Sequence, residues 1–255
     1  MQLPVDKREN VYFILKVVFT ILVLFFVIFG ADSLFRSSQV AMLSTVLIFA
    51  IYILIIWLFI AFQKMYMVAF IKGNGVAISE RQFPDIYAAY TEMAQKIGLK
   101  KVPKLFLVQE GGLLNAFAVR FSGRNYIAIY SEVFSLLHSD INSVKFVLGH
   151  ELGHVRRNHM SKRFWTFPSS LVPFLSAAYS RSCEYTCDNI GKSVISENPL
   201  NGMLLLASGP HLYKEINHDA YVEDAKQNYT FGVRFMHLFM SHPYLPKRLE
   251  NLNKR

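Results

Sequence analysis

Cysteine is almost absent from this chain. Among 255 residues only Cys183 and Cys187 carry a thiol, and they lie four positions apart. Two such neighbours cannot build the disulfide framework that stabilises small extracellular scaffolds. The cysteine content therefore indicates a reducing compartment.

Charged side chains are also scarce. They make up 18% of the residues, against 53% hydrophobic residues, and the mean hydropathy of +0.27 is high for a soluble protein. The net charge of +9 comes from scattered Lys and Arg residues, without a basic stripe interleaved with aromatic residues. We therefore expect no nucleic-acid binding, and contact with anionic lipid explains the positive charge more simply.

Two long apolar runs lie near the N-terminus. The first covers residues 11–30 and is interrupted by Lys16, and the second covers residues 41–62 without any charged residue. Each matches the roughly 20 residues that a helix needs to cross a bilayer. A cleaved signal peptide is the alternative for the first run, but its apolar core would be shorter and no second span would follow so closely. We predict an uncleaved transmembrane hairpin, with Lys16 reaching toward the lipid headgroups.

One short run, Gly-His-Glu-Leu-Gly-His, indicates metal chemistry. His150 and His154 are four residues apart, so on a helix both imidazoles share one face and can bind one Zn²⁺, with Glu151 beside the open coordination position. Such a pattern also arises by chance. The apolar spacing of residues 141–157 fits a helix that Asp140 can cap, and this context favours a zinc peptidase site over two surface histidines.

A catalytic zinc ion takes three protein ligands and a water, so a third ligand is required. His159 does not fit, because the metzincin pattern needs Gly at position 157 and His at position 160, where this chain has Arg and Met. We expect His159 to be an exposed residue at a helix end. The gluzincin arrangement takes a Glu from a later helix, and Glu184 supplies one. Asp188, four residues further on, can fix a ligand histidine.

Cys183 and Cys187 are the competing ligands, because they share the same helical spacing. Thiolate-rich zinc sites are usually structural and closed, whereas Glu151 is useful only beside an open water position. Glu184 is therefore the preferred third ligand.

The remaining pattern predicts an α+β fold. We expect a helix over residues 79–97, strands at 104–109, 113–121 and 126–130, and helices over 131–138 and 141–157. Short Gly-containing connections favour a small antiparallel sheet. The predicted architecture is a mainly helical zincin-type metalloprotease domain with this sheet, anchored by the N-terminal two-helix transmembrane hairpin.

Basic residues outside the two runs predict the orientation. They are Lys7 and Arg8 before the first run and Lys64, Lys72 and Arg81 after the second, whereas the connecting loop carries only Arg36. The positive-inside rule then places both termini in the cytosol of a bacterial-type inner or plasma membrane. Residues 1–10 become a cytosolic N-terminus, residues 11–63 the hairpin, and residues 64–255 a cytosolic zinc metalloprotease domain.

The chain resembles the HtpX-like membrane zinc metalloproteases, which are related to the type I prenyl-protein (CaaX) proteases. The resemblance covers the region from about residue 81 to 249. It rests on His150-Glu151-Leu152-Gly153-His154, on Ser180-Arg181 with Glu184-Tyr185 and Asp188, on Asn115-Ala116-Phe117-Ala118, and on His242-Pro243 with Arg248.

The resemblance implies a role for each matching residue. His150, His154 and Glu184 are the implied ligands of one Zn²⁺ per chain, and Glu151 is the implied general base. The family pattern implies that Asn115 contacts the substrate backbone. From the pattern alone, Asn115, Ala116, Phe117 and Ala118 are the candidate edge strand that binds an extended substrate through main-chain hydrogen bonds, and ordinary structural pairing is the alternative. His242 and Arg248 are implied to stabilise the tetrahedral intermediate.

The segment between the zinc helix and Glu184 departs from the family pattern. HtpX-like proteins usually carry two further spans there, but only 29 residues separate His154 from Glu184 in this chain. Residues 164–179 are apolar, short and interrupted by two prolines, so a full span is not expected. The segment dips into the membrane, lies at its surface or lines a groove. Helices are also expected within 199–213 and 229–240, where aromatic residues pack in a core or lie against lipid.

The implied function is a zinc-dependent endopeptidase. It hydrolyses misfolded or damaged membrane proteins at the cytosolic face, as part of membrane quality control and the stress response. Its expected partners are polypeptide substrates and the lipid bilayer. A prenyl-protein protease is the first alternative, although two spans cannot enclose a large intramembrane chamber. A non-catalytic zinc scaffold is the second alternative. A structural zinc site does not need a base such as Glu151 beside the metal.

Overall fold

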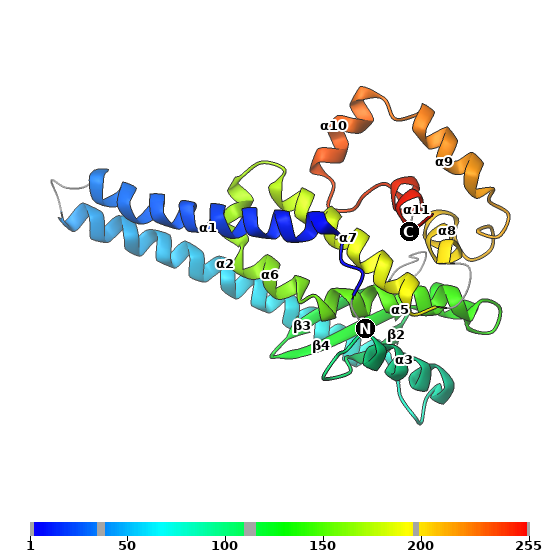
Figure 1. Ribbon diagram of the computed structural model, residues 1–255. Helices are drawn as coiled ribbons and strands as arrows, with labels where there is room; N and C mark the ends of the chain where they lie inside the picture. Colours follow the sequence, from blue (N-terminus) through cyan, green and yellow to red (C-terminus); the bar gives the residue numbers. More distant parts are fainter. Residues whose placement is uncertain (1–2, 35–38, 110–115, 196–198, 254–255) are drawn as a thin grey trace.

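Two long helices extend from one side of the molecule (Figure 1). The computed structural model describes residues 3–34, 39–109, 116–195 and 199–253. Helices α1 (Lys7–Leu34) and α2 (Gln39–Asn74) are long and apolar enough to cross a membrane. Only 11% and 0% of their most apolar windows are buried, so these side chains face outward instead of forming a protein core. The two helices therefore fit a membrane anchor, while the predicted domain division at residues 10 and 63 stays a prediction.

Helix α2 is longer than a membrane requires. Its 36 residues span about 54 Å, against roughly 30 Å for the hydrocarbon core. Its last turns reach the sheet, where Val68 and Ile71 are buried in a cluster with Phe106 and Val119. The hairpin and the body of the protein are thus joined by a packed interface.

Lys16 does not reach toward the headgroups. Its side chain is 2% exposed and its Nζ donates a hydrogen bond of 2.7 Å to Ser176 Oγ. The prediction of an outward-reaching lysine is wrong, because a later helix packs along this part of α1 and supplies a polar partner.

The sheet has four strands in the order β1-β2-β4-β3. They are β1 (Val76–Ile78), β2 (Lys104–Val108), β3 (Ala116–Phe121) and β4 (Arg124–Tyr130). The pairs β1–β2 and β3–β4 are antiparallel, but β2 and β4 are parallel, with Phe106 opposite Ala128. The sheet is therefore mixed, and its predicted antiparallel character is wrong for the central pair. A tight turn at Ser122 and Gly123, both with positive φ, folds β3 to the outside and returns β4 beside β2.

Helices account for most of the remaining chain, and the predicted α+β class is confirmed. They are α3 (Pro84–Lys96), α4 (Ser131–Phe134), η1 (Ser135–Leu137), α5 (Ile141–Arg156), α6 (His159–Trp165), η2 (Phe167–Leu171), α7 (Leu175–Ser193), α8 (Pro199–Ser208), α9 (His218–Gln227), α10 (Phe231–Phe239) and α11 (Leu245–Asn253). Local signals set several ends. Gly98 has φ +82 just after α3, and the Asp140 side chain accepts a hydrogen bond of 3.1 Å from the Ser143 amide at the start of α5.

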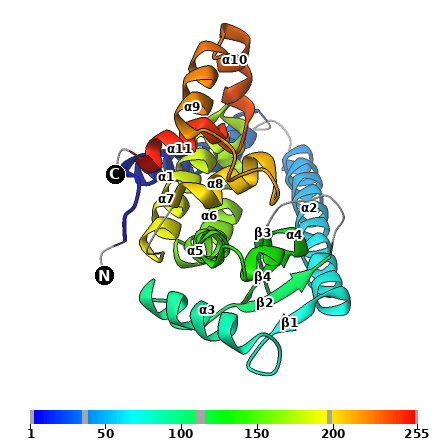
Figure 2. The same cartoon turned by 90° about the vertical axis from the view of Figure 1, so that its right-hand side faces the viewer.

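Helix α5 lies between the sheet and α7 (Figure 2). Glycines allow α5 and α7 to approach closely. A Cβ on Gly149 would lie 2.5 Å from Val194 Cγ2, and one on Gly191 would lie 2.9 Å from the Phe146 carbonyl oxygen. This close packing brings the acidic face of α7 against the histidines of α5.

Candidate active site

A cavity of about 300 Å³ opens between α5, α7, β3 and the segment after α10. The predicted site residues that line it are Ala116, Phe117, Ala118, His150, Glu151, His154, Glu184, His242 and Arg248. Asp188 is fully buried behind His150, and Asn115 lies outside the described residues. Residues from four separate parts of the sequence therefore meet at one site.

Three side chains direct their donor atoms at one another. The Nε2 atoms of His150 and His154 are 3.1 Å apart. His150 Nε2 lies 3.4 Å from Glu184 Oε2, and His154 Nε2 lies 3.4 Å from the other oxygen, Oε1. Zinc–ligand bonds of about 2.0–2.1 Å at tetrahedral angles place neighbouring donors about 3.3 Å apart. The donor set and its spacing fit a zinc ion.

Cys187 competes with Glu184 for the third ligand position. A Cys187 donor also lies within 4.8 Å of donor atoms of His150 and His154. Its Sγ, however, packs 3.2 Å from where a Gly153 Cβ would stand, between α5 and α7, and Cys187 does not line the cavity. Burial raises the pKa of this thiol well above its usual value.

Glu184 has the opposite electrostatics. Burial alone raises its pKa, but hydrogen bonds from His150 and His154 outweigh burial and hold the pKa of Glu184 well below its usual value. Glu184 also lines the cavity whereas Cys187 does not, so we prefer Glu184 as the third ligand.

His150 is supported from within the body of the protein. Its Nδ1 lies 2.9 Å from Asp188 Oδ1, and Asp188 in turn accepts hydrogen bonds of 2.8 and 2.6 Å from Arg248. Burial raises the pKa of Asp188, but the charge and hydrogen bonds of Arg248 lower it further than burial raises it. A proton on Nδ1 facing Asp188 would leave the Nε2 lone pair of His150 available to a metal ion.

His154 is supported by a different route. Its Nδ1 lies 2.9 Å from His159 Nδ1, and His159 Nε2 lies 3.3 Å from Glu9 Oε1 at the start of α1. His159 is 1% exposed, so the prediction of an exposed helix-end residue is wrong. The N-terminal helix covers this position, which the sequence between residues 150 and 160 does not reveal.

Glu9, His159 and Cys183 also lie within 4.8 Å of one another and form a second cluster of possible metal ligands. Arg157 and Lys162 approach the Glu9 carboxylate to 2.8 and 3.4 Å. These cations already balance the charge of Glu9, so this cluster does not require a metal ion.

Glu151 lies in the same cavity as the ligands but differs from Glu184. It is 8% exposed, and burial raises its pKa, although the neighbouring histidines oppose that effect. A carboxylate with a raised pKa is suited to taking up a proton near neutral pH. The two buried glutamates are thus prepared for different tasks.

Arg248 and His242 occupy unequal positions. Arg248 is 5% exposed, and its guanidinium, 3.5 Å from Glu184, is engaged mainly by Asp188. The His242 side chain is 64% exposed, with Nε2 3.6 Å from Glu184 Oε1. His242 therefore stands at the mouth of the cavity, where a bound peptide can reach it.

Strand β3 forms one wall of the cavity. It pairs with β4 on one side, and within the described chain no further strand flanks its other side. Phe117 and Ala118 line the cavity from this strand. An edge strand in this position can pair with an extended peptide through main-chain hydrogen bonds.

Sequence comparison gives a family match over the part of the chain that contains the cavity. The sequence model of peptidase family M48 matches residues 80–169 and 164–255, which include every predicted site residue. A search among curated proteins found no match to the chain.

Proposed function

The chain belongs to peptidase family M48 and is a metallopeptidase, and from this premise we propose that it is a membrane-anchored, zinc-dependent endopeptidase acting on misfolded or damaged membrane proteins at the cytosolic face. The observation that carries the proposal is the meeting of three donor side chains with a separate buried carboxylate, Glu151, in one cavity. A structural zinc site has no use for such a carboxylate.

His150, His154 and Glu184 would hold the ion beside the cavity. A zinc ion held by His150, His154 and Glu184 supplies Lewis acidity toward water and the scissile carbonyl group. Asp188 and His159 would keep the imidazoles in the tautomer that leaves Nε2 free to bind the ion.

Glu151 performs the proton transfers. It accepts a proton from the attacking water as the water oxygen bonds to the carbonyl carbon, and it delivers that proton to the nitrogen as the C–N bond breaks. His242, at the mouth of the cavity, is placed to donate a hydrogen bond to the carbonyl oxygen as negative charge develops there. Arg248 contributes positive charge and holds Asp188 in place.

Substrate selection follows from β3 and the hairpin. Pairing with β3 positions a peptide by its backbone and makes little demand on its sequence. Such loose selection suits unfolded segments of many proteins. The hairpin keeps the enzyme in the bilayer, and the excess of basic residues outside the spans supports a cytosolic active site.

The proposal can be tested with the full-length protein in lipid vesicles. We expect it to cleave the exposed cytosolic segment of a destabilised membrane protein, to lose activity with a zinc chelator, and to regain activity when zinc is restored. Folded versions of the same substrate serve as the control. Bound zinc without cleavage of any polypeptide would favour a scaffold, and cleavage of prenylated peptides alone would favour prenyl-protein processing.

A further inference from the structure

Large apolar side chains are exposed on two segments of the body of the protein. In residues 165–174 the exposed fractions are 75% for Trp165 and 76% for Leu171. On α10 they are 83% for Phe231, 47% for Phe235 and 56% for Phe239. We refer to residues 165–174 together with these three α10 side chains as the apolar surface. Soluble proteins rarely expose so much contiguous apolar area without a partner.

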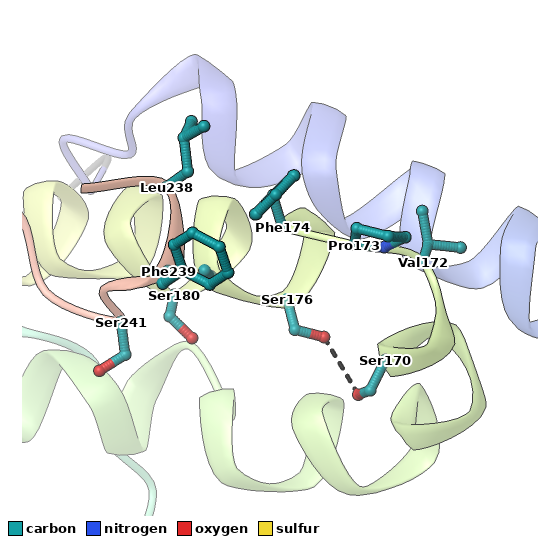
Figure 3. Close-up of a pocket in the computed structure, with 10 residues that line it drawn as sticks. Ser170, Val172, Pro173, Phe174, Ser176, Ser180, Leu238, Phe239 and Ser241 are labelled. Atoms are coloured by element: carbon teal, nitrogen blue, oxygen red, sulfur yellow. Dashed lines mark hydrogen bonds between the residues drawn. The ribbon is translucent and has the colours of Figure 1, made fainter. Parts of the chain in front are cut away.

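The two segments adjoin. The rings of Phe174 and Phe239 meet edge to face, with centroids 5.0 Å apart, and Figure 3 shows both beside a pocket of about 460 Å³. Arg181 on α7 fixes the end of α10, because its Nη1 donates hydrogen bonds of 2.8 and 2.7 Å to the carbonyls of His237 and Met240. The apolar surface is thus one continuous feature on a fixed support.

Helix α1 gives the depth of residues 165–174 relative to the membrane. Trp165 and α1 residues from Phe13 to Ile21 line one pocket. The apolar run of α1 starts at Val11, so these α1 residues lie about 3–15 Å beyond its start. Trp165 therefore stands beside the apolar run of α1, in a pocket that Arg120, Asn158 and Lys162 also line.

Helix α2 gives the same depth independently. Trp165 also shares a pocket with Trp57, Ile60 and Lys64. The apolar run of α2 ends at Phe62, which places Trp57 about 7 Å inside that end. The apolar runs of both helices thus flank Trp165.

The orientation of α10 fits the same membrane. In Figures 1 and 2 α10 runs across the direction of the hairpin, and hence along the plane of a bilayer that the hairpin crosses. Phe231, Phe235 and Phe239 recur at every fourth position and share one face of this helix. A helix with an apolar face in this orientation is typical of the membrane interface.

We propose that the apolar surface is a second membrane contact, in which residues 165–174 dip into the acyl-chain region beside the hairpin and α10 lies at the boundary of headgroups and acyl chains. The catalytic cavity then sits at the bilayer surface, because Ser241 lines the pocket beside the apolar surface and the next residue, His242, lines the cavity. This proposal depends on insertion of the hairpin and not on peptidase activity.

Tryptophan fluorescence provides a direct test, because Trp57 and Trp165 are the only two tryptophans. In the W57F variant, reconstituted in vesicles, we expect lipids brominated on the acyl chain to quench Trp165 about as strongly as they quench Trp57 in the W165F variant. We expect aqueous acrylamide to quench Trp165 weakly. Quenching by acrylamide without quenching by brominated lipid would overturn the proposal, and so would protection from both, which indicates a second protein copy.

Helix α10 needs its own probe. In the W57F/W165F background, F235W should be quenched by lipids brominated near the headgroup. The matched control is L212W, since Leu212 is a 55% exposed apolar residue between α8 and α9. In Figure 1 the segment that joins these helices lies at the end of the molecule away from the hairpin. Equal lipid quenching at both positions, or none at position 235, would contradict a specific α10 contact.

A separate observation concerns the N-terminal helix and the metal site. Glu9 is 0% exposed in the first turn of α1, and its Oε1 lies 3.3 Å from His159 Nε2. When His154 binds a metal through Nε2, its Nδ1 carries a proton that His159 Nδ1, 2.9 Å away, can accept. The remaining proton of His159 is then on Nε2, facing Glu9. Arg157 holds the Glu9 carboxylate with contacts of 3.0 and 2.8 Å.

We infer that Glu9 is a positioning residue, through which α1 fixes His159 and thereby the metal ligand His154. This inference rests on the proposed zinc site and predicts that a change in the membrane hairpin alters metal retention. It concerns how tightly the ion is held, whereas the proposed function concerns what the site hydrolyses.

Zinc release to a chelator tests this inference without any activity measurement. We expect E9Q and H159A each to weaken zinc binding roughly 10–100-fold, and the double variant to weaken it no further than the stronger single variant. E9D should restore part of the loss. Wild-type zinc retention in E9Q would overturn the inference, as would additive losses. A lower melting temperature of the zinc-free E9Q protein with unchanged zinc affinity would show that Glu9 acts only on folding.

Discussion

His150 and His154 both direct Nε2 at the proposed metal position, yet their Nδ1 atoms contact different regions of the molecule. We call the residues that contact each Nδ1 atom its support. His150 depends on Asp188 and Arg248, which lie inside the residues matched by the family model. His154 depends on His159 and, through it, on Glu9, which lies outside the matched residues on a membrane helix. One support thus belongs to the peptidase body, and the other joins that body to its membrane anchor.

The two supports also differ in charge. Asp188 offers a carboxylate directly to His150, whereas His154 meets a neutral ring before it reaches a carboxylate. A carboxylate in direct contact stabilises a metal-bound imidazole more strongly than a neutral acceptor does. We therefore expect His150 to be held more firmly than His154.

The largest expected effect is on catalysis alone, without a loss of zinc binding. E151Q should lower kcat roughly 10²–10⁴-fold, because the amide cannot accept the proton of the attacking water. Zinc content should remain one ion per chain, since Glu151 is not among the three donors that face one another. Steady-state proteolysis and metal analysis of the same preparation measure both quantities. Undiminished proteolysis by E151Q would refute the assignment of the base.

The next variant breaks the support of His150. D188N should weaken zinc binding roughly 10–100-fold and should destabilise the protein by about 3–5 kcal/mol, because buried Arg248 loses its charge partner. The comparison predicts a larger loss than that of E9Q. The control is D219N, whose carboxylate is 92% exposed. Chelator competition and thermal unfolding give the two values, and a D188N protein with tighter zinc than E9Q would reverse the ranking of the supports.

The smallest expected effect concerns the start of the helix that carries both histidines. D140A should destabilise the protein by about 0.5–2 kcal/mol, because the α5 cap is lost. Burial raises the pKa of Asp140, but hydrogen bonds from Ser143 and Tyr213 lower it further, to below its ordinary value of 3.8. The cap therefore stabilises the protein above that pH and is lost as the pH falls through the lower, folded-state pKa.

Melting temperatures measured against pH test this prediction. Wild type and D140A should differ at neutral pH and converge in strong acid. A difference that is unchanged at pH 2 would show that ionised Asp140 does not provide the stabilisation.

The sequence predicted those parts of the fold that depend on local signals. Asp140, the apolar spacing of α5 and Gly98 set helix ends and faces within a few residues, and the structure confirms them. The direction of β4 relative to β2 depends on where β3 is placed in space. No local pattern encodes that choice, and the antiparallel prediction was wrong for this pair.

In the candidate site, too, residues close in sequence could be predicted, whereas a contact between distant residues could not. His150, Glu151 and His154 lie within one helix turn or so, and the spacing of Glu184 and Asp188 was enough to suggest them. Their roles stay predictions, although the structure brings all five together. The contacts behind His154 could not be predicted, because they include Glu9. Glu9 lies 148 residues before its partner Arg157 in the sequence. At the edge of an apolar run, Glu9 resembles an ordinary membrane-flanking charge.

The supports of His150 and His154 affect zinc binding only if both histidines bind one zinc ion together with Glu184. X-ray absorption at the zinc edge tests this ligand set most directly. The account predicts nitrogen and oxygen neighbours at about 2.0–2.2 Å, without a sulfur shell. The C183S and C187S variants should give the same spectrum as the wild type. A sulfur neighbour at about 2.3 Å that disappears in C187S would contradict the account, because the site would then be closed by a thiolate instead of being completed by Glu184.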